Sequence, residues 1–169
     1  MSNWGATRQE RGTALPCDAL LPNGIRADRA ISIAAPPAIV FGWLCQLRVA
    51  PYSYDLLDNL GRRSPRRRTP ALTHLAIGQR FMTLFTLHSF ADGEHITLRS
   101  AGVAVTYAVR PLDTGARLQA RVRFGGPRIL ARLLAVGDLV MMRKQLLTLR
   151  AFAAREARNE MSDTQIRRP

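Results

Sequence analysis

The apolar positions between residues 79 and 124 recur at every second residue, which is typical of β-strands that bury one face. The pattern runs through QRFMTLFTLHSF (79–90), EHITLRS (94–100), VAVTYAVRP (103–111) and ARLQARVRF (116–124). Asp92-Gly93 lies between the first two segments and predicts a hairpin in which Leu87 faces Leu98. Together these segments predict an antiparallel meander with one apolar face.

The flanking segments predict one further strand and three helices. A short alternating strand, RAISIAA (29–35), is followed by PPAIVFGWLCQL (36–47), in which apolar residues recur at helical spacing. YSYDLLDNLG (52–61) predicts a second short helix. The C-terminal segment from Pro127 to about Arg158 predicts a long helix with a weak point at Gly137-Asp138 and an apolar stripe. That stripe comprises Leu133, Val140, Met141, Leu147 and Phe152.

A sheet with one apolar face needs a cover, and the C-terminal helix is the only predicted element long enough to provide it. The predicted fold is therefore α+β of the helix-grip type. A curved antiparallel sheet wraps around a long C-terminal helix, and two short helices follow the first strand. We expect residues 26–159 to form this domain, residues 1–25 to be a partly flexible N-terminal extension, and residues 160–169 to be a disordered tail.

The charge of the chain adds an anionic partner to the candidate functions. The formal net charge is +13, and Lys144 is the only lysine among 25 basic residues. Such an excess favours an anionic ligand, membrane or nucleic acid, although a general coding preference for arginine explains the same total. No signal-peptide pattern or bilayer-spanning apolar run is visible, and the two cysteines form no metal or disulfide motif. We therefore expect a cytoplasmic protein.

The segment ISIAAPPAIVFGWLCQL (31–47), read with this order of elements, resembles the START-like superfamily. This superfamily is also called SRPBCC, or polyketide cyclase/dehydrase and lipid-transport-like proteins. The most specific piece is I-x-I-x-A-P-P-x-x-V-F-x-W-L, and the resemblance covers roughly residues 26–158. VAPYSYDLLDNLGRRSP (49–65) and GDLVMMRKQLLTL (137–149) are similar to a bacterial SRPBCC subgroup.

The resemblance implies a hydrophobic cavity between the sheet and the C-terminal helix that holds a lipid, sterol, polyketide or other apolar molecule. No cofactor is predicted. It supplies no shared catalytic motif, so the lining has to be predicted from the faces of the elements. The side chains predicted to face the cavity are Phe81, Phe85, Tyr107, Phe124, Val140 and Met141.

The segment GRRSPRRR predicts a solvated loop, because Pro65 within it and Pro70 after it disfavour a helix. Contact with an anionic membrane or ligand headgroup is an alternative for its five arginines, Arg62, Arg63, Arg66, Arg67 and Arg68. The absence of aromatic residues between Asp55 and Phe81 disfavours nucleic acid as the partner. By alternation, Arg80, Arg99, Arg110, Arg117, Arg121 and Arg123 point outward from the sheet, where they form a second basic surface.

Three functions remain open from the sequence. The first is the binding or transport of a small hydrophobic ligand, and the second is an enzyme of the cyclase, aromatase or dehydratase type. An enzyme needs an acid or base inside the cavity, for which the candidates are Tyr54, Asp55 and Tyr107. The third is arginine-mediated binding to anionic membrane or nucleic acid. No metal site is predicted, because the two histidines beside the hairpin fall on its solvated face.

Overall fold

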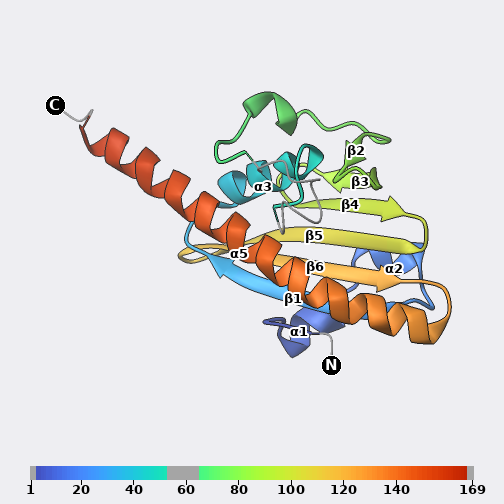
Figure 1. Ribbon diagram of the computed structural model, residues 1–169. Helices are drawn as coiled ribbons and strands as arrows, with labels where there is room; N and C mark the ends of the chain where they lie inside the picture. Colours follow the sequence, from blue (N-terminus) through green and yellow to red (C-terminus); the bar gives the residue numbers. More distant parts are fainter. Residues whose placement is uncertain (1–2, 53–64, 167–169) are drawn as a thin grey trace.

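The computed structural model describes residues 3–52 and 65–166, with side chains described as far as residue 163. It contains a six-stranded antiparallel sheet in the order β1-β6-β5-β4-β3-β2, held against a long C-terminal helix, α5 (Figure 1). The strands are β1 (Ile25–Ile33), β2 (Arg80–Phe81), β3 (Phe85–Ala91), β4 (His95–Ser100), β5 (Val103–Leu112) and β6 (Gly115–Phe124). The helices are α1 (Arg8–Gly12), α2 (Pro16–Leu20), α3 (Pro37–Cys45), η1 (Gln46–Arg48), η2 (Pro70–Thr73) and α5 (Arg128–Ile166). The predicted α+β helix-grip arrangement is confirmed.

The register of the sheet follows the alternation of the sequence. Leu87 pairs with Leu98 as predicted, and a bulge between Leu87 and Ser89 then shifts the pairs nearer the turn by one residue. Gly93 in this turn has a φ of 73°, which glycine adopts without steric cost. The inner face, which contacts α5, carries the core residues of β1, β4, β5 and β6.

α3 follows β1 after a short turn, and all of its residues from Ile39 to Cys45 are buried. Pro37 occupies its first position, where a missing amide proton costs nothing. Trp43 packs against Tyr52 and against Phe152 of α5, with ring centroids 5.9 and 5.0 Å away. The helix predicted over residues 52–61 falls largely outside the described residues.

α5 is a continuous helix of 39 residues that runs through Gly137-Asp138, the predicted weak point. It also continues to Ile166, beyond the point where the sequence predicts a disordered tail. Its buried positions recur at helical spacing and are mostly small: Ala131, Ala135, Met142, Leu146, Leu149, Ala153 and Ala157. Alanine allows the helix axis to approach the sheet closely.

The predicted apolar stripe of α5 is wrong in its first half. Leu133, Val140 and Met141 are 66%, 56% and 38% exposed, whereas Leu147 and Phe152 pack against the core. Apolar side chains occur on both sides of this half of the helix, so their spacing alone did not identify the buried side.

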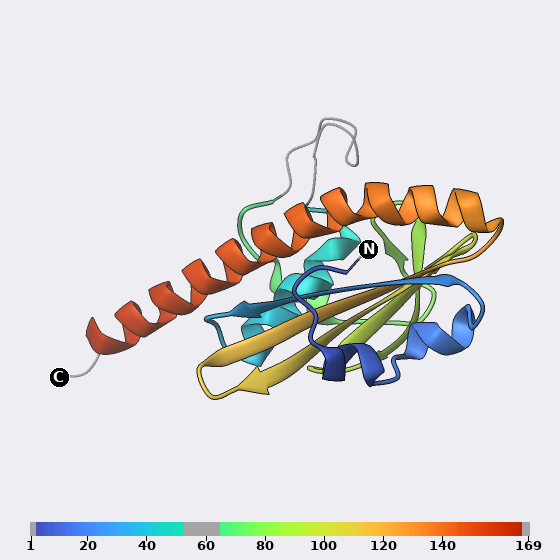
Figure 2. The ribbon, with the colours of Figure 1, turned by 90° about the horizontal axis from the view of Figure 1, so that it is seen from below.

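The N-terminal segment covers the outer face of the sheet, on the side opposite α5 (Figure 2). α1 begins with a capping box formed by Thr7 and Glu10, and α2 packs its Cys17 against Ala104 and Ala108 of β5. Before these helices, Trp4 forms a parallel bridge with Arg29 at the edge of β1. Residues 3–24 are therefore an integral layer of the fold.

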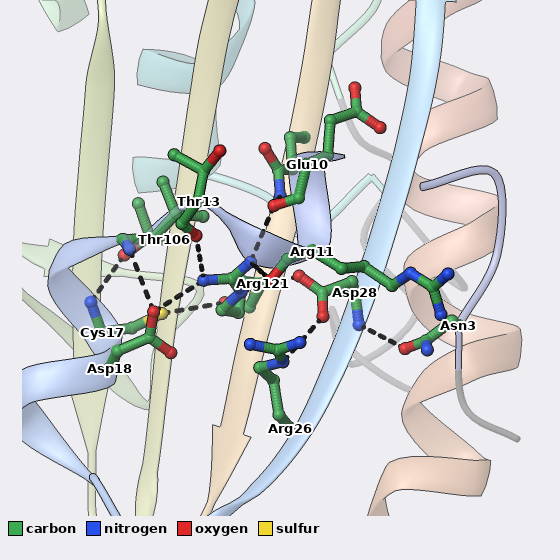
Figure 3. A network of polar contacts seen from close by, with 12 residues as sticks. Asn3, Glu10, Arg11, Thr13, Cys17, Asp18, Arg26, Asp28, Thr106 and Arg121 are labelled. Carbon is green, nitrogen blue, oxygen red and sulfur yellow. Dashed lines mark hydrogen bonds and ion pairs between the residues drawn. The ribbon is translucent and has the colours of Figure 1, made fainter. Parts of the chain in front are cut away.

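This layer neutralises the basic outer face of β6. Arg121 is fully buried and donates to Asp28 Oδ1 (2.7 Å), to Asp18 Oδ2 (2.6 Å) and to three backbone carbonyl oxygens of the N-terminal segment (Figure 3). Arg117 pairs with Glu10 at 2.6 Å, and its hydrogen bond lowers the pKa of Glu10 to about 2. Arg117, Arg121 and Arg123 do lie on the outer face as the alternation predicts. They are not a free basic surface, because acids and carbonyls of the same chain cover them.

Candidate functional site

A row of inner-face residues crosses the middle of the sheet. In this row Tyr107 of β5 pairs with Ala120 of β6, and Ala120 pairs with Arg29 of β1. The three side chains share one face because residues that are paired across antiparallel strands lie on the same side. On the face that α5 covers, the small side chain of Ala120 therefore lies between the phenol of Tyr107 and the guanidinium of Arg29.

Arg29 is fully buried beneath α5. Its Nη2 lies 2.9 Å from Asp138 Oδ2 and donates to the carbonyl oxygen of Ala135 at 3.2 Å. Its Nε and Nη1 are also buried, and neither has a hydrogen-bond partner in the described structure. Most buried polar groups in proteins are hydrogen-bonded, so two unpartnered donors on one guanidinium are an exception that needs a reason.

Tyr107 belongs to a second polar chain next to this pair. Its hydroxyl donates to Gln145 Oε1 at 2.7 Å, and Gln145 Nε2 donates to the carbonyl oxygen of Pro51 at 2.5 Å. These contacts connect β5, α5 and the end of the segment after η1. They hold the hydroxyl in place within an otherwise apolar interface.

Burial and neighbouring charge shift the pKa values of this cluster. Burial raises the pKa of Asp138 to about 6, although the charge of Arg29 acts in the opposite direction. Burial is the main cause that raises the pKa of Tyr107, and the negative charge of Asp138 raises it further. Burial lowers the pKa of Arg29. Asp138, whose side chain is 23% exposed, is therefore an acid that can exchange a proton near neutral pH at the margin of the helix–sheet interface.

The structure brings only some of the predicted cavity residues together. Phe81, Tyr107 and Phe124 are buried on the inner side of the fold, and Phe85 packs partly against the same core. Val140 and Met141 lie on the exposed side of α5, so the face predicted for them is wrong. Met142 and Gln145 occupy the inward positions instead. Of the acid–base candidates, Tyr107 is in the cluster, whereas Tyr54 and Asp55 lie outside the described residues.

The arginine segment is attached to α5 by one of its members. Arg68 donates from Nε and Nη2 to Glu156 Oε1, at 3.0 and 2.5 Å, while Trp43 Nε1 donates to Glu156 Oε2 at 2.8 Å. Arg66 and Arg67 are exposed, and Arg62 and Arg63 lie outside the described residues. Arg68 therefore serves an intramolecular ion pair and is not available to an external anion in this conformation.

We expect Glu156→Ala to lower the free energy of unfolding by about 1–3 kcal/mol, because it leaves the buried indole N–H of Trp43 and the Arg68 guanidinium without their acceptor. Urea denaturation followed by circular dichroism measures this change. Asp163→Ala, at an exposed position of the same helix, is the matched control and should change stability by less than about 0.5 kcal/mol. Equal effects of the two substitutions would show that the Glu156 contacts do not stabilise the fold.

A separate open pocket of about 860 Å³ lies at the other end of the sheet. It is formed by the β1–α3 turn, the β5–β6 turn and the C-terminal part of α5, and its lining includes Ala35, Ile39, Leu112 and Ala157. Ala157 is 19 residues after Asp138 along a continuous helix, about 28 Å away. The pocket and the polar cluster are therefore two distinct regions of the same helix–sheet interface.

No protein-family model matches this sequence, and the comparison with curated proteins finds no significant match. Solved structures do match in fold. Protein NE0264 from Nitrosomonas europaea aligns with a TM-score of 0.53 and 15% identity over 84% of this chain and 99% of that one. Protein MLL2253 from Mesorhizobium loti aligns with a TM-score of 0.53 and 16% identity over 78% and 98% of the two chains. The chain and these structures share the helix-grip fold.

A third match, protein CV1439 from Chromobacterium violaceum, has a TM-score of 0.50 and 17% identity over 79% of this chain and 99% of that one. At these identities the helix-grip likeness concerns the fold alone, so any function has to be argued from the residues of this chain. Within the described residues, no cluster of three or more potential metal ligands occurs, and no helix is long and apolar enough to cross a bilayer.

Sequence reasoning missed the two charged members of the cluster, although signals for both were present. Ala27, Arg29, Ile31 and Ile33 alternate along β1, which places an arginine in line with inward apolar positions. Asp138 is the only acid between Asp113 and Glu156. When each of two facing elements carries one isolated charge among its apolar, inward-facing residues, and the two charges are opposite, the pattern predicts a buried ion pair.

Proposed function

We propose that this protein binds a small, mostly apolar molecule between the sheet and α5, and that Arg29 binds an oxygen acceptor of that molecule. The observation that carries the proposal is the pair of unpartnered, buried donors on Arg29, Nε and Nη1. A carbonyl or carboxylate oxygen satisfies such donors with charge-assisted hydrogen bonds. The surrounding apolar core residues suit the remainder of the ligand.

The small side chains around Arg29 support this location. Ala27 and Ala120 flank it on the sheet, and Ala131 and Ala135 face the sheet from α5. In this conformation side chains pack over the two free nitrogens, so binding requires a shift of α5 or of the side chains beneath it. The flexible Met142, which points inward, is the side chain best suited to adapt.

The decisive test uses two neighbouring methionines with opposite orientations. Met142 is 6% exposed and Met141 is 38% exposed. For a fluorescent apolar carboxylate titrated into the protein, we expect saturable binding that Met142→Trp weakens at least about tenfold, because the indole fills the proposed site. Met141→Trp makes the same change on the outer side and should leave the affinity within about twofold.

The anchoring role of Arg29 is tested in the same titration. The double variant Arg29→Met/Asp138→Leu removes both charges together, so that neither is left buried and unpaired. We expect it to remain folded and to bind the probe about tenfold more weakly. Undiminished binding in this variant, or in Met142→Trp with unchanged circular dichroism, would place the probe elsewhere and refute the proposal.

The cluster also favours a second candidate function, an enzyme of the cyclase, aromatase or dehydratase type. Asp138, with its pKa raised to about 6, can deliver or accept a proton close to Arg29 and to the Tyr107 hydroxyl. Incubation of the protein with the apolar molecule that native mass spectrometry finds bound to it distinguishes the two functions. A change in the mass or absorption of that molecule that Asp138→Asn abolishes supports an enzyme, whereas an unchanged molecule supports a carrier.

A further inference from the structure

The first half of α5 exposes an unusual number of large apolar side chains. From Arg128 to Lys144 the exposed ones are Ile129 (77%), Leu130 (52%), Leu133 (66%), Leu134 (46%), Val136 (62%), Val140 (56%) and Met141 (38%). We call these seven residues the outer apolar face. After Lys144, the only large apolar side chain of α5 as exposed as these, within the described part, is Met161.

The outer apolar face is one continuous surface. Successive residues of an α-helix are rotated by about 100° around the helix axis. Viewed along that axis, the seven residues lie within an arc of about 160°, with Val136 at one end and Leu134 at the other. Only Gly137 and Lys144 fall within this arc. Soluble monomers rarely expose apolar patches of this extent unless the patch is an interaction site.

The charges beside this face are all of one sign. The exposed charged residues are Arg128, Arg132, Arg143 and Lys144. Asp138 is the only acid of this half, and it points toward the sheet, where it pairs with Arg29. Arg143 also lies over the ring of Trp4, at 5.5 Å from its centroid, which brings an aromatic side chain to the border of the face. The second half differs, because its exposed residues include acids such as Glu160 and Asp163.

We propose that the outer apolar face docks α5 onto the surface of an anionic membrane. Apolar side chains enter the boundary between headgroups and acyl chains, while the flanking arginines contact anionic headgroups, as in amphipathic helices that lie in the interface. No described helix can span a bilayer, so this contact is peripheral. Charge complementarity favours this occupant over a second copy of the chain, which supplies only more apolar and basic side chains from the same surface.

Co-sedimentation with lipid vesicles tests this proposal. We expect the protein to bind phosphatidylcholine vesicles that contain about 30% phosphatidylserine, to bind pure phosphatidylcholine vesicles much more weakly, and to lose binding as salt rises. Leu133→Glu/Val140→Glu places two acids within the outer apolar face and should lower the partition coefficient at least about tenfold. Both positions are exposed, so the fold should be retained.

The matched control adds the same two charges to the other half of α5. Asn159→Glu/Met161→Glu should lower the partition coefficient by less than about threefold, because only the net charge changes. Absence of wild-type binding to anionic vesicles would overturn the proposal, as would an equal loss in the two variants. Sedimentation equilibrium provides a further test: a wild-type dimer that Leu133→Glu/Val140→Glu converts to monomer would assign the face to a second copy instead.

Discussion

Replacing Arg121 by methionine should lower the free energy of unfolding by about 3–5 kcal/mol, the range expected when one partner of a buried ion pair is removed. The guanidinium is fully buried and bonds Asp28, Asp18 and three backbone carbonyl oxygens. Without it, Asp28, at 1% exposure, keeps the partly exposed Arg26 as its one ionic partner among the described residues. Urea denaturation at neutral pH measures the loss.

Two further variants separate the buried network from a general effect of charge. Arg99→Met removes an exposed arginine from β4 and should change stability by less than about 0.5 kcal/mol. Arg121→Met/Asp28→Asn also removes the charge of the buried Asp28 side chain and should recover part of the lost stability. A loss in Arg121→Met no larger than that in Arg99→Met would mean that the N-terminal layer is not held by this arginine.

The sheet could be predicted because its determinants are local. Alternation in β3 to β6 specified which side chains face inward, and Asp92-Gly93 specified the first hairpin of the meander. The long helix and its place over the apolar face followed from the need to cover that face. Tyr107, the acid–base candidate within the described residues, was placed on the inner face by this strand alternation.

The remaining features depend on long-range partners that no local pattern reveals. The seven residues of the outer apolar face are as apolar as the buried residues of α5, so hydrophobicity does not distinguish the two faces. The buried face is the one whose alanines fit closely against β1. The N-terminal residues appeared flexible because their partners, Arg117 and Arg121, lie about 100 residues away. Arg29 and Asp138 are likewise 109 positions apart, and only the packing of α5 on β1 brings them together.

The two proposals assign a separate role to each side of the first half of α5. Its inner side carries Asp138 against Arg29 above the proposed ligand site, and its outer side carries the surface proposed to meet the membrane. A shift of this helix on a membrane would act directly on the side chains packed over Arg29. Taken together, the two proposals predict that contact with a membrane changes the affinity of the site for its ligand.

The titration of Asp138 should appear as a pH dependence of stability. Its pKa rises from 3.8 to about 6 on folding, so the folded protein binds the proton more tightly than the unfolded chain. The resulting stabilisation is complete below pH 3.8 and is lost as the pH rises through 6. We expect the free energy of unfolding, measured relative to Asp138→Asn, to fall by up to about 3 kcal/mol between pH 4 and pH 7. Subtracting the variant removes the contributions of groups such as Glu10. A difference that instead grows as the pH rises would show that Arg29 keeps Asp138 ionised, and would exclude Asp138 as the proton donor of the candidate enzyme.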